Sequence, residues 1–325
     1  MTNKKYDVVA LGELLIDFTE NGLSEQGNPL LEANPGGAPC NVLSMLQKLG
    51  DKTAFIGKVG NDGFGHLLTK AVQEQGIDTT GLVYDNDVHT TLALVLKKEN
   101  GDRDFAFYRN PGADMNLKEE EVNESLIASS SIFHFGTLSL TDESVKMATQ
   151  KAVKAAKENG LTITFDPNLR EPLWRSLEEA HEQVAWGLQQ ADVVKISDNE
   201  ITWFTGMDNY DEGIAFLQKE YPNLKLICLS MGGDGSKAVY RDIHVAYPAF
   251  LQEATIETTG AGDTFCACMI HTVLENGIDH LDEEKLKEML KFANAAASLV
   301  TTKKGALRVM PTKEEVETFI ENFKR

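Results

Sequence analysis

The sequence predicts an α/β fold in which helices cover a mostly parallel central sheet. Short apolar runs with β character alternate with amphipathic stretches along most of the chain, and glycines follow the amphipathic stretches. This alternation is typical of parallel strands joined by crossover helices. We see no linker long enough to separate two halves, so we expect residues 1–325 to form a single domain.

The predicted strands are short and apolar, and the predicted helices lie between them. The strands are expected at residues 7–16, 53–59, 132–136, 161–166, 193–197 and 225–230. Helical patterns cover residues 38–49, 64–75 and 144–159, and they are followed by Gly50, Gly76 and Gly160. A glycine just past a helix readily adopts the left-handed conformation that commonly ends it.

One region departs from this alternation and predicts a small β-sheet lid. Residues 90–97 and 103–109 are β-rich and flank Glu99-Asn100-Gly101-Asp102, and Asn-Gly is a strong hairpin signal. Together with residues 19–34, this hairpin is expected to project from the main domain, where a substrate lid would sit. We place the lid at about residues 12–35 and 88–113. Its apolar run 91–96 is compatible with a homodimer through the lid.

The net charge limits the expected partners. The chain has 31 basic and 50 acidic side chains, which gives a charge of −19 at pH 7. This field repels nucleic acid and anionic membranes, so we expect neither as a partner. A small polyanion such as ATP would need a positive pocket, made locally by helix N-termini, a few Arg or Lys side chains and Mg²⁺.

The cysteines and the start of the chain favour a cytoplasmic protein. The four cysteines lie in apolar segments and are too few for a disulfide framework. Lysines precede the first apolar run, but Glu13 and Asp17 interrupt it, so we interpret it as a strand rather than a secretion signal. No run of 18 uncharged apolar residues predicts a transmembrane helix.

The sharpest motif lies at the start of a predicted helix that closes at Gly277. It reads Thr258-Thr259-Gly260-Ala261-Gly262-Asp263-Thr264-Phe265. A glycine-bracketed turn that opens a helix leaves several N–H groups pointing one way, and together with the helix dipole they form an anion site. Asp263 could accept a proton from a nucleophilic hydroxyl there. The alternative is that Asp263 only caps the helix.

Two further positions suggest ligand contacts. Gly36 and Gly37 would let the backbone approach a ligand, and Asn41 offers a donor and an acceptor in the first helical turn. The segment could also be a plain helix entry with Pro39 at its first position. Asp17 ends the first predicted strand, where open α/β sheets bind ligands, and could accept polyol hydroxyls or be a solvated strand end.

Other glycine-rich and cysteine-containing segments do not predict known sites. Residues 57–65 match neither the P-loop nor the dinucleotide spacing. Residues 233–238 fit G-x-G-x-x-A, but β-like residues follow where that motif requires a helix. Cys266, Cys268 and His271 do not share one helix face, so packing explains them better than metal binding.

Taken together, the motifs resemble the ribokinase-like (PfkB-type) sugar kinases, from Val8 to about Phe319. The resemblance rests on Gly36-Gly37-Ala38 with Asn41, on residues 57–65, and on residues 259–265. Two longer strings, at residues 107–115 and 166–174, are most similar to fructokinases. The resemblance implies a three-layer α/β/α domain with a β lid, and transfer of the ATP γ-phosphoryl group to a sugar hydroxyl.

The resemblance also assigns roles to individual residues. Asp263 would be the catalytic base, helped by Arg170 and by an anion hole made of Gly260, Ala261 and Gly262. The sugar would contact Asp17, Gly36, Gly37, Asn41, Phe107 and Arg109, the last two closing over it from the lid. The nucleotide side would comprise Asn168, Lys195, Ser197, Ser230, Gly232, Gly233, Gly235 and Asn294.

Metal positions follow from the same resemblance. Glu200 would order Mg²⁺ and its waters. Glu257 and Thr259 lie where the family binds a monovalent cation such as K⁺, but many relatives have Asp in place of Glu257, so K⁺ activation is a hypothesis.

We therefore expect a cytoplasmic ATP-dependent fructokinase that makes fructose 6-phosphate. A kinase of the same family acting on 2-keto-3-deoxygluconate or ribose is the nearest alternative. A sugar-sensing protein without turnover and a nucleotide-dependent oxidoreductase are alternatives of other classes, and the intact turn at Gly260 to Asp263 argues against the sensor.

Overall fold

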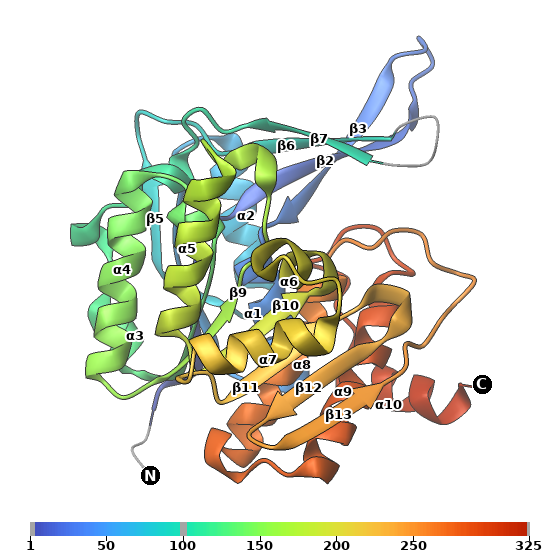
Figure 1. Cartoon of the computed structure of the whole chain (residues 1–325). Coiled ribbons are helices and arrows are strands. Elements are labelled where there is room, and N and C mark those ends of the chain that lie inside the picture. The colour runs from blue at the N-terminus through green and yellow to red at the C-terminus, as the bar shows by residue number, and fades with distance from the viewer. Residues whose placement is uncertain (1–3, 98–102, 324–325) are drawn as a thin grey trace.

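A nine-stranded sheet forms the middle of the molecule (Figure 1). The computed structural model describes residues 4–97 and 103–323. The strands of this sheet are β1 (Tyr6–Leu11), β4 (Thr53–Gly60), β5 (Asp78–Asp85), β8 (Ser130–Gly136), β9 (Thr162–Asp166), β10 (Val193–Ser197), β11 (Leu226–Ser230), β12 (Ser236–Tyr240) and β13 (Ile243–Tyr247). They lie in the order β13-β12-β11-β10-β9-β8-β1-β4-β5, and only the pairings of β12 are antiparallel.

Helices pack on both faces of this sheet and make three layers. One apolar core includes α1 (Ala38–Leu49), α2 (Gly63–Glu74), α8 (Ala261–Asn276), α9 (Glu283–Val300) and α10 (Lys313–Asn322). The other includes α3 (Glu124–Ala128), α4 (Glu143–Glu158), α5 (Leu177–Gln190), α6 (Asp198–Thr205) and α7 (Tyr210–Glu220). Successive residues of β1 enter opposite cores, Val8 the first and Val9 the second, because strand side chains alternate between the two faces.

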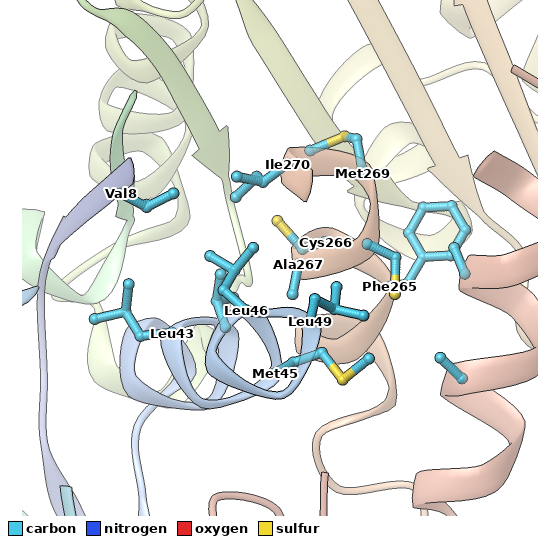
Figure 2. Close-up of a cluster of buried hydrophobic side chains, with 14 of the residues drawn as sticks. Val8, Leu43, Met45, Leu46, Leu49, Phe265, Cys266, Ala267, Met269 and Ile270 are labelled. Atoms are coloured by element: carbon cyan, nitrogen blue, oxygen red, sulfur yellow. The ribbon is translucent and has the colours of Figure 1, made fainter. Parts of the chain in front are cut away.

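The packing of α1 against α8 is the contact that matters most for the site. Figure 2 shows their apolar side chains meeting between the two helices, with Leu46 of α1 beside Ala267 of α8. Both side chains are fully buried. Pro39 in the first turn of α1 and the left-handed Gly50 after its last residue delimit that helix. The start of each helix is therefore held in a fixed position relative to the other.

A second, smaller sheet projects from the main body at the top of Figure 1. Its strands are β2 (Leu15–Leu23), β3 (Pro29–Gly36), β6 (Leu92–Lys97) and β7 (Arg103–Tyr108), in the order β3-β2-β6-β7. We call this sheet the lid. Leu23, Leu30, Leu31 and Tyr108 are exposed on it. The pairing of two lids in a homodimer stays a prediction.

The expected α/β architecture with its lid sheet is confirmed, and three details differ from the sequence prediction. The run 7–16 is not one strand, because the chain turns at residues 12–14 and leaves the main sheet for the lid. Gly12 lies in this turn, where a Cβ would be 2.5 Å from the Pro39 ring. The strand β5 was not predicted, and the helix expected from Phe265 begins at Ala261. The expected hairpin turn at residues 99–102 lies outside the described residues.

The strands β12 and β13 confirm that residues 233–238 are not followed by a helix. Within the ranges 4–97 and 103–323, no helix is both long enough and apolar enough to cross a membrane.

Candidate active site

Two adjoining cavities, each of about 300 Å³, meet at the start of α8. Thr258 and Gly262 line both of them. The first cavity, between the lid and the main sheet, collects the predicted residues Asp17, Gly37, Asn41, Phe107, Asn168, Arg170, Glu257, Thr259, Gly260, Gly262 and Asp263. The second collects Ser230, Gly232, Gly233, Gly235, Ala261 and Asn294. We call them the lid cavity and the α9 cavity.

The turn before α8 presents backbone N–H groups where the cavities meet. Gly260 is the N-cap, with a left-handed φ of 79°. A Cβ there would lie 2.6 Å from the Ala306 Cβ, so both backbone conformation and space favour glycine. First-turn N–H groups of a helix lack intrahelical partners, and the helix dipole adds a partial positive charge. This geometry is compatible with an anion site, and anion binding at this turn stays a prediction.

Asp263 is the third residue of α8 and does not cap it, because no side chain caps this helix. Its Oδ2 accepts a hydrogen bond of 2.8 Å from Asn41 Nδ2, and the residue is 9% exposed. Burial raises the pKa of this carboxyl, while the Asn41 hydrogen bond and the charges of Lys195 and Arg170 lower it. A buried carboxylate beside an anion site is suited to accept a proton from a hydroxyl.

The other polar atom of the Asn41 amide is its oxygen. This Oδ1 is buried and makes no hydrogen bond within the described part of the chain. An unpaired buried oxygen costs free energy, so this part of the site is polar but not fully satisfied.

Asp17 lies at the base of the lid, in β2. Burial raises its pKa to about 7; the Arg170 charge opposes this rise, and the charges of Asp263 and Glu257 add to it. Gly36 on the neighbouring strand β3 faces it, and any Cβ there would collide with Asp17 Oδ2. Gly36 therefore makes room for the carboxylate and does not line the cavity.

Glu13 is a cavity residue that the sequence analysis missed. It is 5% exposed, and its Oε1 accepts a 2.7 Å hydrogen bond from the Ala38 N–H at the start of α1. Burial raises its pKa to about 7. A signal was available, because an acidic residue soon after the first buried strand stands where open α/β sheets bind ligands.

The ionisable groups of the lid cavity are mostly acidic. Among the described residues that line it, the carboxyl side chains are Glu13, Asp17, Glu257 and Asp263. They face a single guanidinium, that of Arg170. Carboxylates accept hydrogen bonds and repel anions, so this cavity suits an uncharged molecule with many hydroxyl groups.

Three predicted residues lie behind the cavities and line neither of them: Lys195, Ser197 and Glu200. Lys195 Nζ is 3.1 Å from Asp166 Oδ2, and a Cβ on Gly262 would lie 3.2 Å from this ammonium. Glu200 accepts the N–H of Leu169 with Oε1 and that of Ser197 with Oε2, each at 2.8 Å, so it joins the 167–170 segment to α6. Burial raises the pKa of Glu200, but the Lys195 charge and these hydrogen bonds outweigh it and lower the pKa.

Arg109, expected over the sugar, does not line the lid cavity. It is 7% exposed and paired with Asp114, its Nη2 lying 2.7 Å from Oδ2 of that carboxylate. It also donates to Thr141 Oγ1 and to the Leu138 carbonyl. Because these partners hold its guanidinium, Arg109 lies just past the end of β7 and does not reach the cavity, whereas Phe107 within β7 lines it.

The residues present also fit a magnesium ion that arrives with a nucleotide. In the ranges the structure describes, no three His, Cys, Asp or Glu side chains gather in a way that could hold a metal alone. Mg²⁺ in phosphoryl-transfer sites commonly relies on substrate phosphates, waters and one or two carboxylates. Glu200 and Asp166, both near Lys195 behind the anion site, are carboxylates that fit this role.

Solved structures of sugar kinases share this fold. The ATP-bound fructokinase of Xylella fastidiosa superposes with a TM-score of 0.88 at 29% identity, over 97% of this chain and 98% of that one. A fructokinase double mutant of Vibrio cholerae O395, in a fructose, ADP and potassium ion bound form, gives 0.86 at 27% identity, over 98% and 100%. An E. coli structure described as Ribokinase II, in complex with ATP and Mg²⁺, gives 0.86 at 26% identity, over 97% and 99%.

Sequence comparisons agree with the structural ones. The chain is 42% identical to Fructokinase-1 of Zea mays over 316 residues, which is 97% of each protein. It is 41% identical to "Probable fructokinase-2" of Arabidopsis thaliana, over 96% of this chain and 95% of the relative. The family model for pfkB family carbohydrate kinases matches residues 5–313. The chain therefore belongs to the pfkB family and is a carbohydrate kinase.

Proposed function

We propose that this carbohydrate kinase is a fructokinase, which transfers the γ-phosphoryl group of ATP to D-fructose and makes fructose 6-phosphate. The observation that carries the proposal is the lid cavity, whose carboxyl groups can accept hydrogen bonds from the hydroxyls of a sugar. A hexose supplies such donors and carries no charge. The fructokinases of Zea mays and Arabidopsis thaliana support the choice of sugar, since each is about 40% identical to this chain over nearly its full length.

In the proposed reaction the sugar hydroxyl oxygen attacks the γ-phosphorus of ATP. Asp263 accepts the hydroxyl proton, a P–O bond forms to the sugar, and the bond to the ADP oxygen breaks. The N–H groups at the start of α8 hold the phosphoryl oxygens during transfer, and Arg170 adds a positive charge from the lid-cavity side. Bound Mg²⁺ would neutralise negative charge on the phosphates. We propose that Glu200 is the carboxylate that lies behind this ion.

Charge separates the proposed substrate from the nearest alternative. The carboxylate of 2-keto-3-deoxygluconate would enter a cavity where four carboxyl groups outnumber one guanidinium, that of Arg170, among the described lining residues. The Arg109 guanidinium is already paired with Asp114. Ribose carries no charge, so only the shape of the lid cavity could exclude it. A sensor that does not turn over sugar would not need a buried carboxylate at the anion site, and Asp263 is such a carboxylate.

The proposal also includes the cellular compartment in which the enzyme acts. The four cysteines are buried free thiols, at Cys40, Cys228, Cys266 and Cys268. Free thiols fit a reducing environment, so we propose that the enzyme acts in the cytoplasm.

The test of the function is ADP release from Mg-ATP with D-fructose, ribose and 2-keto-3-deoxygluconate offered separately at equal protein concentration. We expect fructose to give the highest kcat/KM and the acid sugar to give the lowest. Faster turnover of ribose or of the acid sugar would keep the kinase and overturn the choice of substrate. No turnover on a wider sugar panel would favour the sensor.

Replacing the proposed base tests the mechanism. Asp263→Asn keeps the size of the side chain but cannot accept the proton, so we expect kcat to fall by about 10² to 10⁴. Fructose binding measured by calorimetry should change little. Ser44→Ala, at a buried position of α1 that lines neither cavity, removes a hydrogen bond to the Leu307 carbonyl and serves as a control for disturbance of buried α1. Near-normal turnover by folded Asp263→Asn protein would refute the assignment.

The hydrogen bond from Asn41 predicts a pH effect. The bond lowers the pKa of Asp263, so its removal in Asn41→Ala should raise that pKa. Because the base acts only when deprotonated, the acid limb of the kcat/KM profile should move to higher pH. An acid limb at the wild-type position would show that Asn41 does not tune the base, whatever its effect on KM.

Potassium activation is proposed on Glu257 and Thr259. Glu257 Oε1 accepts the Gly305 N–H at 2.8 Å and so ties the segment before α8 to the 301–307 loop. Its carboxylate and the nearby carbonyls are hard oxygen ligands of the kind alkali cations prefer. Rates measured in K⁺, Na⁺ and Tris buffers at equal ionic strength should be highest in K⁺. Equal rates in all three would reject the site.

A further inference from the structure

Glu13 lies where the chain leaves the main sheet for the lid. It follows β1 and stands two residues before β2, in the turn at residues 12–14. The residue is buried and lines the lid cavity, but the proposed reaction does not use it. Because a buried carboxyl group is unfavourable unless hydrogen bonds compensate for its burial, the partners of this side chain indicate its role.

The turn at residues 12–14 packs tightly against the start of α1. A Cβ on Gly12 would lie 2.5 Å from the Pro39 ring, and a Cβ on Gly37 would collide with the Glu13 carbonyl oxygen. Neither position has room for a side chain without a shift of the backbone, since the packed segments have no free space between them. The entrance to the lid and the start of α1 are therefore in direct contact.

The start of α1 has no cap from its own N-cap residue. That residue is Gly37, which has no side chain to accept a hydrogen bond. Glu13 Oε1 instead accepts the N–H of Ala38, the first residue of α1, at 2.7 Å. This N–H is one of those that lack an intrahelical partner, and a carboxylate also interacts favourably with the positive end of the helix dipole. Glu13 thus caps α1 across a sequence separation of 25 residues.

One peptide group joins Glu13 to Asn41. The carbonyl of Gly37 and the N–H of Ala38 belong to the same peptide bond, which is planar and rigid. Glu13 binds the N–H of this group, and its carbonyl accepts the Asn41 N–H at 3.0 Å. Asn41 in turn donates from Nδ2 to Asp263 Oδ2 at 2.8 Å. A rotation of this peptide group would therefore displace Asn41 from Asp263.

We propose that Glu13 is a positioning residue that, through the Gly37–Ala38 peptide group, holds Asn41 in place to bind the catalytic base. This inference rests on the proposed function, because it takes Asp263 as the base. Glu13 acts here as a hydrogen-bond acceptor rather than as a charge, and a glutamine oxygen can accept the same N–H. Since Glu13 directly precedes the lid strand β2, it also connects the lid to the base.

The charge of Glu13 and the charge of Asp263 have different neighbours. The ionisable groups that interact with Asp263 are Lys195, Arg170, Asp17, Asp166 and Cys266. Those that interact with Glu13 are Asp114, Arg109 and Cys40. Loss of the Glu13 charge alone should therefore leave the pKa of Asp263 nearly unchanged. Loss of the Asn41 hydrogen bond should raise that pKa, because this bond lowers it.

The experiment measures the acid limb of the kcat/KM profile for D-fructose in two Glu13 variants. Glu13→Gln keeps an oxygen for the Ala38 N–H, so we expect its acid limb within about 0.3 pH unit of the wild type. Glu13→Met has a similar length but no oxygen, and we expect its limb to move up by about 0.5 to 1 unit. A Glu13→Met limb at the wild-type position, or equal shifts in both variants, overturns the inference.

A double variant tests whether Glu13 and Asn41 act through the same hydrogen bond. Asn41→Ala already removes the bond to Asp263, so adding Glu13→Met should move the acid limb by less than about 0.3 pH unit more. Two shifts that simply add would mean that Glu13 affects the base by another route, and they would overturn the inference.

Asp62→Ala is the matched control. Asp62 accepts the N–H of Gly65 at the start of α2 and the N–H of Thr90, each at 2.8 Å. It thus joins a helix start to a segment two residues before the lid strand β6, as Glu13 does before β2. No described residue of α2 lines either cavity, so we expect the acid limb of this variant at the wild-type position. A shift equal to that of Glu13→Met would make the effect a general one of lost caps and overturn the inference.

Hydrogen exchange separates this inference from the proposed function, because it needs no substrate. Exchange of the amides at the start of α1, followed by mass spectrometry, should be about tenfold faster in Glu13→Met and near wild type in Glu13→Gln. If no sugar is turned over but this pattern is found, the fructokinase proposal fails and the control of α1 by Glu13 holds. Equal exchange in all three proteins overturns the inference. Glu13→Ala takes the place of Glu13→Met in every measurement if the latter does not fold.

Discussion

The packing of α1 against α8 is the constraint on which the site depends. Residues 38–49 and 261–276 are far apart in the chain, yet their buried apolar faces bring the two helix starts to one edge of the sheet. Only this packing lets Asn41 donate to Asp263 across a sequence separation of 222 residues. Because protein cores are close-packed, a small shift of either helix would move the carboxylate relative to the anion site. The alignment on which phosphoryl transfer depends is thus a consequence of the core.

The layered fold followed from local sequence patterns, whereas the route of the chain between sheets did not. Apolar periodicity and terminal glycines placed α1 at its observed bounds, and five of the short apolar runs matched strands of the main sheet closely. The turn at residues 12–14 escaped prediction because its cause is tertiary: Gly12 lies against the Pro39 ring of a later helix. The edge strand β5 escaped because its mixed Thr, Asp and apolar residues resemble a loop.

The parts of the site that depend on backbone geometry could be predicted from the sequence. The parts in which side-chain partners set the position of a residue were less predictable. The turn at Gly260 to Asp263 needs glycine conformations and a helix start, and the sequence shows both. The position of Arg109 depends on Asp114 and on the Leu138 carbonyl, and that of Glu200 depends on two N–H groups. No local pattern shows such partners, so a charged residue in a motif can be recognised while its orientation cannot. Glu13 is the opposite case. Its place after the first buried strand suggested a ligand site, but no distinctive motif marks it.

The distribution of charge over the two cavities explains how a chain with a net charge of −19 could bind a triphosphate. The lid cavity is lined by four carboxyl groups and the far end of the α9 cavity by no charged side chain. A polyanion is therefore repelled from one end and gains nothing electrostatic at the other. The favourable position lies between them, at the N-terminus of α8, with Arg170 on one side and Lys195 beneath Gly262. Repulsion and attraction together would confine the phosphates to the junction, and the neutral sugar and the neutral base would then occupy the two ends.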